Sequence, residues 1–176
     1  MHQPPVPIRF ELPSADWQPV DPAGVGVTNV IFFAARGGVE GDFTPTLSVS
    51  GGWRRTVDSL ADMGDQTLAK IAAEGATDVE LVDRRQVESD TAPMLSQTVG
   101  ATAVVEGRRF DLRQTQVILG YVDLERPERT AIFIHTLTCT FKQSPVLAEE
   151  FRTYLASVAP VAPTEKPGPS GDPTPA

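Results

Sequence analysis

The sequence predicts an α+β fold in which helices are attached to a mainly antiparallel sheet. Three long stretches, residues 95–106, 109–121 and 130–141, have the length and composition of β-strands. Only short turns separate them, and short turns join antiparallel neighbours because parallel strands need a long crossover. Two other stretches, residues 57–74 and the segment after Ser144, repeat apolar side chains at the spacing of an amphipathic helix.

Composition predicts a single domain, residues 8–159, between two disordered ends. Residues 1–7 and 160–176 are rich in proline and bury little apolar surface. Hydrophobic residues make up 40% of the chain and charged residues 22%, which is ordinary for a globular domain. The formal net charge of -8 argues against nucleic acid and against an electrostatic membrane anchor, because both need clustered basic residues.

The first part of the chain supplies three predicted strands. Residues 8–13 alternate apolar and polar side chains, which is typical of a strand with one buried face. Residues 27–35 form a continuous apolar run, which indicates a strand buried on both faces. Residues 46–50 predict the returning strand of a hairpin, and we expect it to end at Gly51 and Gly52.

The first predicted helix covers residues 57–74. Thr56 is a suitable N-cap, and Gly75 is a suitable C-terminal stop. Residues 78–82 then alternate like a strand, and the charged residues 83–85 predict a break after it.

Beyond this break, the three long strands suggest a sheet with a core side and a polar side. In the last strand, alternate residues from Phe133 to Phe141 are mainly apolar, and threonines occupy the opposite phase. The middle strand carries Gln114 and Gln116, which we interpret as partners of threonines across the sheet, with a polar site as the alternative. After the meander, Ser144 is the predicted cap of the second helix.

No motif for catalysis, phosphate binding or metal binding stands out, so we expect a non-enzymatic protein with no cofactor and no metal. Acid–base catalysis needs positioned groups within reach of one substrate. Asp111 and His135 are the one candidate pair, and the strand phases do not show that they meet. Cys139 lies in an apolar strand phase, which is typical of a small buried hydrophobe.

The sequence also predicts no transmembrane segment, because no apolar run approaches the roughly 20 residues that span a bilayer. The N-terminus lacks the basic region and apolar stretch of a signal peptide. We therefore expect a cytoplasmic protein. The alternative is an exported protein from which the signal has been removed.

Several short motifs between residues 8 and 159 carry a resemblance to a known fold. They are FELP at 10–13, Trp17, PTLSV at 45–49, LAKI at 68–71, GRRFDLRQTQ at 107–116, IHTLTCTF at 134–141 and FRTYL at 151–155. With the order of predicted elements, they resemble the PsbP-like fold shared with the Ran-binding Mog protein. Within that fold, the sequence is most similar to the actinobacterial LpqN/LpqT-type lipoproteins.

This resemblance implies an α/β/α sandwich around an antiparallel sheet, and a role in binding rather than catalysis. Relatives act as envelope lipoproteins, as a photosystem accessory subunit, as a GTPase-binding protein and as chaperones of secreted effectors. The sequence departs from the lipoproteins because it has no lipobox cysteine near its N-terminus.

Our leading hypothesis is a non-enzymatic protein-binding module, such as an adaptor or chaperone linked to secretion or the cell envelope. The candidate partner-binding residues are Glu40, Asp42, Phe43 and Trp53, which combine acidic charge with aromatic anchors. Trp53 could equally fill the core. The alternative is a small-molecule or lipid-binding protein with a large apolar cavity between sheet and helix. An exposed sheet edge could also pair with a second copy to form a homodimer.

Overall fold

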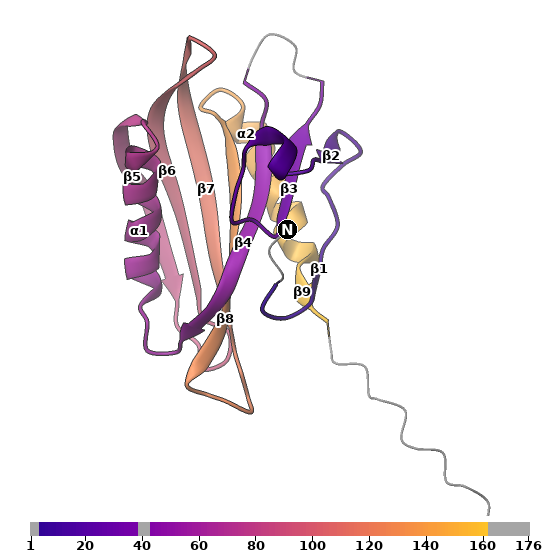
Figure 1. The fold of residues 1–176 in the computed structure, drawn as a ribbon, viewed down its shortest axis with the longest axis vertical. Helices are drawn as coiled ribbons and strands as arrows, with labels where there is room; N and C mark the ends of the chain where they lie inside the picture. The colour runs from indigo at the N-terminus through magenta and orange to yellow at the C-terminus, as the bar shows by residue number, and fades with distance from the viewer. Residues whose placement is uncertain (1–3, 39–42, 162–176) are drawn as a thin grey trace, which may run out of the picture.

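The computed structural model describes residues 4–38 and 43–161, and its centre is a seven-stranded antiparallel sheet (Figure 1). The strand order is β2-β3-β4-β8-β7-β6-β5, and each strand is antiparallel to its neighbours. The strands are β2 Trp17–Pro19, β3 Phe32–Arg36, β4 Thr46–Arg55, β5 Thr77–Val87, β6 Met94–Val105, β7 Arg108–Val122 and β8 Arg129–Thr140. The predicted α+β class and the three-strand meander are thus confirmed.

Two α-helices pack on opposite faces of this sheet (Figure 1). Helix α1, Leu60–Ala73, packs on β5 and β6, whereas α2, Ser144–Ser157, packs on β8. The resulting α/β/α sandwich is the architecture that the resemblance implied. The two helices are offset, so α1 leaves the β4 and β8 half of its own face uncovered, and that half carries the groove described below.

Each face of the sheet has its own apolar cluster. On the α2 face, the buried cluster comprises Trp17, Ala34, Leu47, Val49, Val117, Ala131, Phe133, Leu137, Cys139, Leu147, Phe151 and Tyr154. On the α1 face, the buried cluster is limited to Leu60, Met63, Leu95, Ile118 and Ile132. The predicted polar side of the sheet is therefore covered in part by a helix, and the main core lies on the α2 face.

Two predicted strand ends differ from the structure. Strand β4 continues past Gly51 and Gly52 to Arg55, because the missing side chain of Gly51 permits a close approach to β8. A Cβ atom at Gly51 would clash with the carbonyl oxygen of Ile132. The predicted break at residues 83–85 is also wrong, since β5 runs through it and absorbs the irregularity as register shifts against β6.

The first helix begins later than predicted, because Ser59 rather than Thr56 caps it. The Ser59 hydroxyl accepts a hydrogen bond from the backbone N–H of Asp62 at 3.3 Å. Thr56 instead donates its hydroxyl to the carbonyl oxygen of Pro127 at 2.6 Å, which ties the end of β4 to the β7–β8 turn. The predicted stop at Gly75 agrees with its φ of 99°, a conformation that favours glycine.

The second helix lies where the sequence placed it, but Ser144 is its first residue and Gln143 is the N-cap. The Ser144 hydroxyl donates to the carbonyl oxygen of Phe141 at 3.0 Å instead of capping the helix. Gln143 accepts a hydrogen bond from the backbone N–H of Thr140 at 2.9 Å. The turn from β8 into α2 is therefore held by side chains on both sides of it.

The N-terminal segment lies beside the end of α2 rather than in the main sheet. Of the predicted strand 8–13, only β1, Ile8–Arg9, is extended in a ladder, and it pairs with β9, Ala159–Pro160, as a separate two-stranded sheet. Val6 packs against the α2-side core. Val6 and Pro160 thus have defined positions within the predicted disordered ends, whereas residues 1–3 and 162–176 lie outside the described residues.

The predicted apolar strand 27–35 is shorter in the structure, where β3 begins at Phe32. A short 3-10 helix, η1 Ala23–Val25, and a bend precede it. Asn29 in this bend has a φ of 61°, which turns the chain before the strand. Across residues 4–38 and 43–161, neither helix is long and apolar enough to cross a membrane.

Candidate functional site

Of the four residues singled out as a partner surface, the structure describes Phe43 and Trp53, and these two lie far apart. Phe43 precedes β4 and Trp53 lies near its other end, so ten residues of extended chain separate them by about 33 Å. Glu40 and Asp42 lie outside the described residues. A joint surface of Phe43 and Trp53 would have to extend along the whole of β4.

Both aromatic residues are half-buried among neighbours at opposite ends of the strand. Phe43 meets Phe110 edge-to-face, with 5.5 Å between ring centroids. Trp53 lies under the guanidinium of Arg129 at 4.1 Å, and Arg129 in turn forms an ion pair with Asp123. These contacts give both rings a role in packing, and their role in partner binding stays a prediction.

The candidate acid–base pair does not meet. His135 is fully buried between the sheet and α2, where its Nδ1 lies 2.7 Å from the Tyr154 hydroxyl. Its Nε2 has no hydrogen-bond partner among the described residues, and burial lowers the pKa of His135 to about 4. Asp111 is exposed and lies six residues along β7 from Val117, the residue paired with His135, a separation of about 20 Å.

The cysteine is equally unsuited to catalysis. Cys139 is buried in the α2-side cluster, and burial raises its pKa to about 11. The reactive form of a cysteine is the thiolate. Because this pKa keeps the group a thiol at neutral pH, Cys139 is a core residue, as the sequence predicted.

The middle of α2 is tied to β2 and β3 by a half-buried carboxylate. Glu150 accepts hydrogen bonds from Trp17 Nε1 at 2.6 Å and from Arg36 at 3.1 and 3.2 Å. Burial by itself raises the pKa of Glu150, but the hydrogen bonds from Arg36 and Trp17 outweigh it and lower the pKa below its usual value. This cluster joins α2 to the N-terminal strands, so its role is structural.

The α1 face carries a row of polar side chains that crosses five neighbouring strands. The cross-strand pairs place these residues one opposite another, in the order Arg84, Gln97, Gln116, Thr136 and Ser48. Cross-strand neighbours on one face lie close enough for their side chains to interact. The row is therefore a single polar band, part of it under α1 and part of it in the open half of the face.

Under α1, the polar band is saturated by hydrogen bonds. Arg84 Nε donates to Gln97 Oε1 at 2.9 Å, and Gln97 Nε2 donates to Gln116 Oε1 at 2.6 Å. Gln116 then donates to Gln114 at 2.6 Å, and Gln114 donates to the Thr138 hydroxyl at 3.1 Å. The interpretation of the two glutamines is half right, since Gln114 pairs with a threonine but Gln116 joins an amide chain.

In the open half, the band becomes the floor of a groove of about 650 Å³ between α1 and strands β4 and β8. Ser48, Ser50 and Thr136 lie on this floor half-buried, and their hydroxyls form no hydrogen bond with any other described residue. One wall is α1, which contributes Gln66 and Lys70. These hydroxyls are free to bind a ligand, whereas the amides beside them are occupied.

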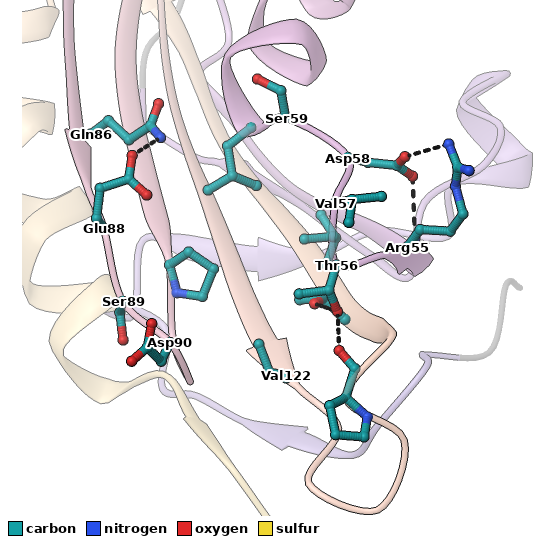
Figure 2. A pocket seen from close by; sticks show the side chains of 15 residues that line it. Arg55, Thr56, Val57, Asp58, Ser59, Gln86, Glu88, Ser89, Asp90 and Val122 are labelled. Carbon is teal, nitrogen blue, oxygen red and sulfur yellow. Dashed lines mark hydrogen bonds and ion pairs between the residues drawn. The ribbon is translucent and has the colours of Figure 1, made fainter.

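A second hollow of about 490 Å³ lies beneath the first turn of α1, and Figure 2 shows its side chains. On one side are Glu88 and Asp90, which follow β5. On the other are Arg55, the last residue of β4, and Asp58, which follows that strand. Asp58 forms an ion pair with Arg55 at 3.0 Å, and Gln86 donates to Glu88 at 2.5 Å. The apolar part of the lining comes from Leu60, Pro93, Val122, Pro127 and Ile132, with Val57 exposed at the rim.

The long open edge of the sheet is β5. Two register shifts interrupt its pairing with β6, and Asp83, Arg84 and Arg85 lie along it. Bulges and charged side chains are the devices by which natural sheet edges resist pairing with other strands. A homodimer through this edge stays a prediction, and these features disfavour it.

No protein-family model matches the sequence. No curated protein matches it either. Solved structures do match the fold. LpqN of Mycobacterium tuberculosis, described as involved in cell envelope biogenesis, has a TM-score of 0.55 and 9% identity, over 89% of this chain and 86% of its own. CyanoP, the PsbP of Synechocystis sp. PCC 6803, has a TM-score of 0.53 and 16% identity, over 84% of this chain and 83% of its own.

The chain has a PsbP-like fold. The fold also matches PA94 of Pseudomonas aeruginosa, a protein of unknown function described as a putative regulator. It has a TM-score of 0.53 and 18% identity, over 74% of this chain and 83% of its own. The predicted PsbP-like architecture and the likeness to LpqN are confirmed, and at these identities the likeness shows the fold alone.

Sequence reasoning did not single out Ser48, Ser50, Gln97 or the residues around the second hollow. Their signal is weak, because isolated serines and glutamines in strands are common on any partly exposed sheet. The signal that could have found them is polar residues recurring in the helix-facing phase of neighbouring strands. Using it requires the strand order and register, which the alternating pattern does not supply.

Proposed function

We propose that this protein is a non-enzymatic binding module whose partner is a protein, and that the partner contacts the α1 side of the sheet. The observation that carries this proposal is the interrupted polar band. Its amides are saturated under α1, while the hydroxyls of Ser48, Ser50 and Thr136 face the groove without an intramolecular partner. Half-buried polar groups gain from a hydrogen-bonding ligand that replaces water.

The chemistry of the groove favours a polar partner over a lipid. A lipid chain laid on this floor would remove three hydroxyls from water without supplying hydrogen bonds, which is unfavourable. The groove is therefore not the large apolar cavity that the lipid-binding alternative needs. An adaptor or chaperone linked to the envelope is the form of the proposal that the likeness to LpqN favours, whether the protein is cytoplasmic or exported.

Affinity purification of the tagged full chain from its own organism tests this proposal, with proteins and extractable small molecules both identified. The matched variants are Ser50→Trp, which fills the groove, and Thr98→Trp, which places the same ring at a half-buried position on the opposite face. Circular dichroism confirms that both variants fold.

We expect a stoichiometric protein that is retained by the wild type and by Thr98→Trp and lost from Ser50→Trp. A partner that binds all three equally would place the binding surface elsewhere. A metabolite lost from Ser50→Trp, with no protein lost, would instead support the small-molecule alternative.

A further inference from the structure

We infer that the partner presents an extended segment along α1 and places a basic side chain in the hollow of Figure 2. This inference rests on the proposed function and specifies the partner's chemistry. It follows from three properties of the α1 side: the hollows adjoin one another, the end beneath α1 is acidic, and that end has an apolar floor.

The hollows on this side form a row around α1. A smaller hollow shares Arg54, Met63 and Gln66 with the groove, and it shares Val57, Asp58 and Ser59 with the hollow of Figure 2. Between Ser59 and Glu74, the lining follows α1 for about 22 Å, the length of an extended peptide of about seven residues. A row of this length suits a polymer, whereas a small molecule would occupy one hollow and leave the others empty.

The end beneath α1 carries an excess of negative charge. Carboxylates of Asp58, Asp62, Glu88 and Asp90 line the hollow of Figure 2 and its smaller neighbour, against the guanidinium groups of Arg54 and Arg55. One carboxylate is balanced by the Arg55 ion pair, but Asp90 has no side-chain partner among the described residues. With a formal net charge of -8, the protein attracts a cationic segment to this end and repels an anionic one.

The apolar floor makes the hollow suitable for a long basic side chain in particular. Lysine and arginine have aliphatic stems that pack on apolar surface while the charged head remains at the polar rim. Here Leu60, Pro93 and Ile132 would contact the stem, and Glu88 and Asp90 would contact the head. Val57, with 82% of its surface exposed, adds an apolar contact at the rim. A simple cation would use the carboxylates and leave this floor unused.

Selection from a random peptide library on the immobilised full chain tests the inference. We expect enriched peptides to contain arginine or lysine and to be depleted in acidic residues. A synthetic copy of an enriched peptide is then titrated by calorimetry against the wild type and the variants. Asp90→Lys should weaken binding by about tenfold or more, since it replaces attraction with repulsion beside the basic group.

Asp111→Lys is the matched control, because it makes the same charge change at an exposed residue on the opposite face. It should change the affinity by less than about twofold, since salt screens charges at that separation. Ser50→Trp should also weaken binding if the peptide continues into the groove.

Three results would overturn the inference: no enriched peptide, enrichment without basic residues, or equal losses for Asp90→Lys and Asp111→Lys. Loss of the protein partner from Ser50→Trp tests the proposed function separately. If that loss occurs and Asp90→Lys retains the partner fully, the partner binds the groove but does not place a basic side chain beneath α1.

Discussion

The two faces of the sheet differ in the kinds of side chains that they bury. The α2 face is a large apolar core in which the buried polar pair of His135 and Tyr154 sits among aromatic rings. The α1 face has a small apolar cluster, and beside it Gln97 and Gln116 are buried in a chain of hydrogen bonds. One helix is thus held mainly by burial of apolar surface, whereas the other is held in part by Gln97, whose Nε2 donates to the carbonyl oxygen of Gly64 in α1 at 3.1 Å.

This difference separates stability from specificity. Apolar burial contributes roughly 25 cal/mol for each Å² removed from water and does not depend strongly on orientation. A buried amide contributes little net free energy when paired, but leaving it unpaired costs about 1–3 kcal/mol. The α2 face can therefore supply most of the folding free energy, while the α1 face fixes one placement of its helix and leaves half its polar band available for binding.

The comparison predicts its largest effect at Phe133, which is fully buried on the α2 face. Phe133→Ala should lower the free energy of unfolding by about 3–5 kcal/mol, because it opens a cavity in a packed aromatic core. Chemical denaturation measures this loss. Ile134→Ala is the control, since Ile134 is next to Phe133 in the chain but is only half-buried and lies on the α1 face. An equal loss at both positions would contradict the division between the faces.

Stability should also fall in mildly acidic solution because of His135. Its pKa is about 4 in the folded protein against an ordinary value of 6.5, so between these values the unfolded chain binds a proton that the native protein does not. The free energy of unfolding should fall by about 3 kcal/mol as the pH drops from 6.5 to 4, and the contribution is fully present above pH 6.5.

Denaturation at a series of pH values measures this effect, with His135→Phe as the variant that removes it. The lowered pKa of Glu150 acts in the same direction, but its stabilising contribution is lost only as the pH falls below its ordinary value of 4.5. The His135 effect therefore begins at higher pH. A wild-type profile that is flat between pH 6.5 and 5 would show that the imidazole is not held neutral by burial.

On the α1 face, we expect a smaller loss from Gln97→Leu, of about 2 kcal/mol. The substitution leaves Arg84 and Gln116 without their buried partner, and unpaired buried groups are costly even when the new side chain is apolar. Combining it with Gln116→Leu should cost less than the sum of the two single substitutions, because the residues share one hydrogen bond. Additive losses, measured by the same denaturation, would mean that the chain does not act as a unit.

The smallest effect should come from Thr136→Val in the groove. Its hydroxyl forms no hydrogen bond with another described residue, so the free energy of unfolding should change by less than about 0.5 kcal/mol. Partner binding, measured on the same protein, should weaken. A loss of stability above about 1 kcal/mol would assign this hydroxyl to the fold and weaken the case for the groove.

The α+β class, the meander and both helices could be predicted from the sequence because periodicity and chain breaks are local signals. The strand residues from Phe133 to Cys139 show their two faces directly in the alternation. Predictions failed where a contact with a distant strand decides the outcome. In the sequence alone Gly51 predicts the end of a strand, but its missing side chain is what permits β8 to lie beside it.

The candidate site was the least predictable part for the same reason. As aromatic residues near acidic loops, Phe43 and Trp53 were predicted to share a partner surface, yet they are at opposite ends of β4. The polar band consists of Arg84, Gln97, Gln116, Thr136 and Ser48, which come from five separate strands. No single segment shows it, because it exists only after the strands are placed in order and in register.

The amide chain beneath α1 has one further consequence, which concerns communication across the sheet. Arginine can only donate hydrogen bonds, so Arg84 obliges Gln97 to present its oxygen, and each following amide must then turn the same way as far as Thr138. The orientation of a side chain at the middle of the sheet is thereby dictated from its edge. A change of Arg84 to an acceptor would therefore require every amide of the series to turn the other way.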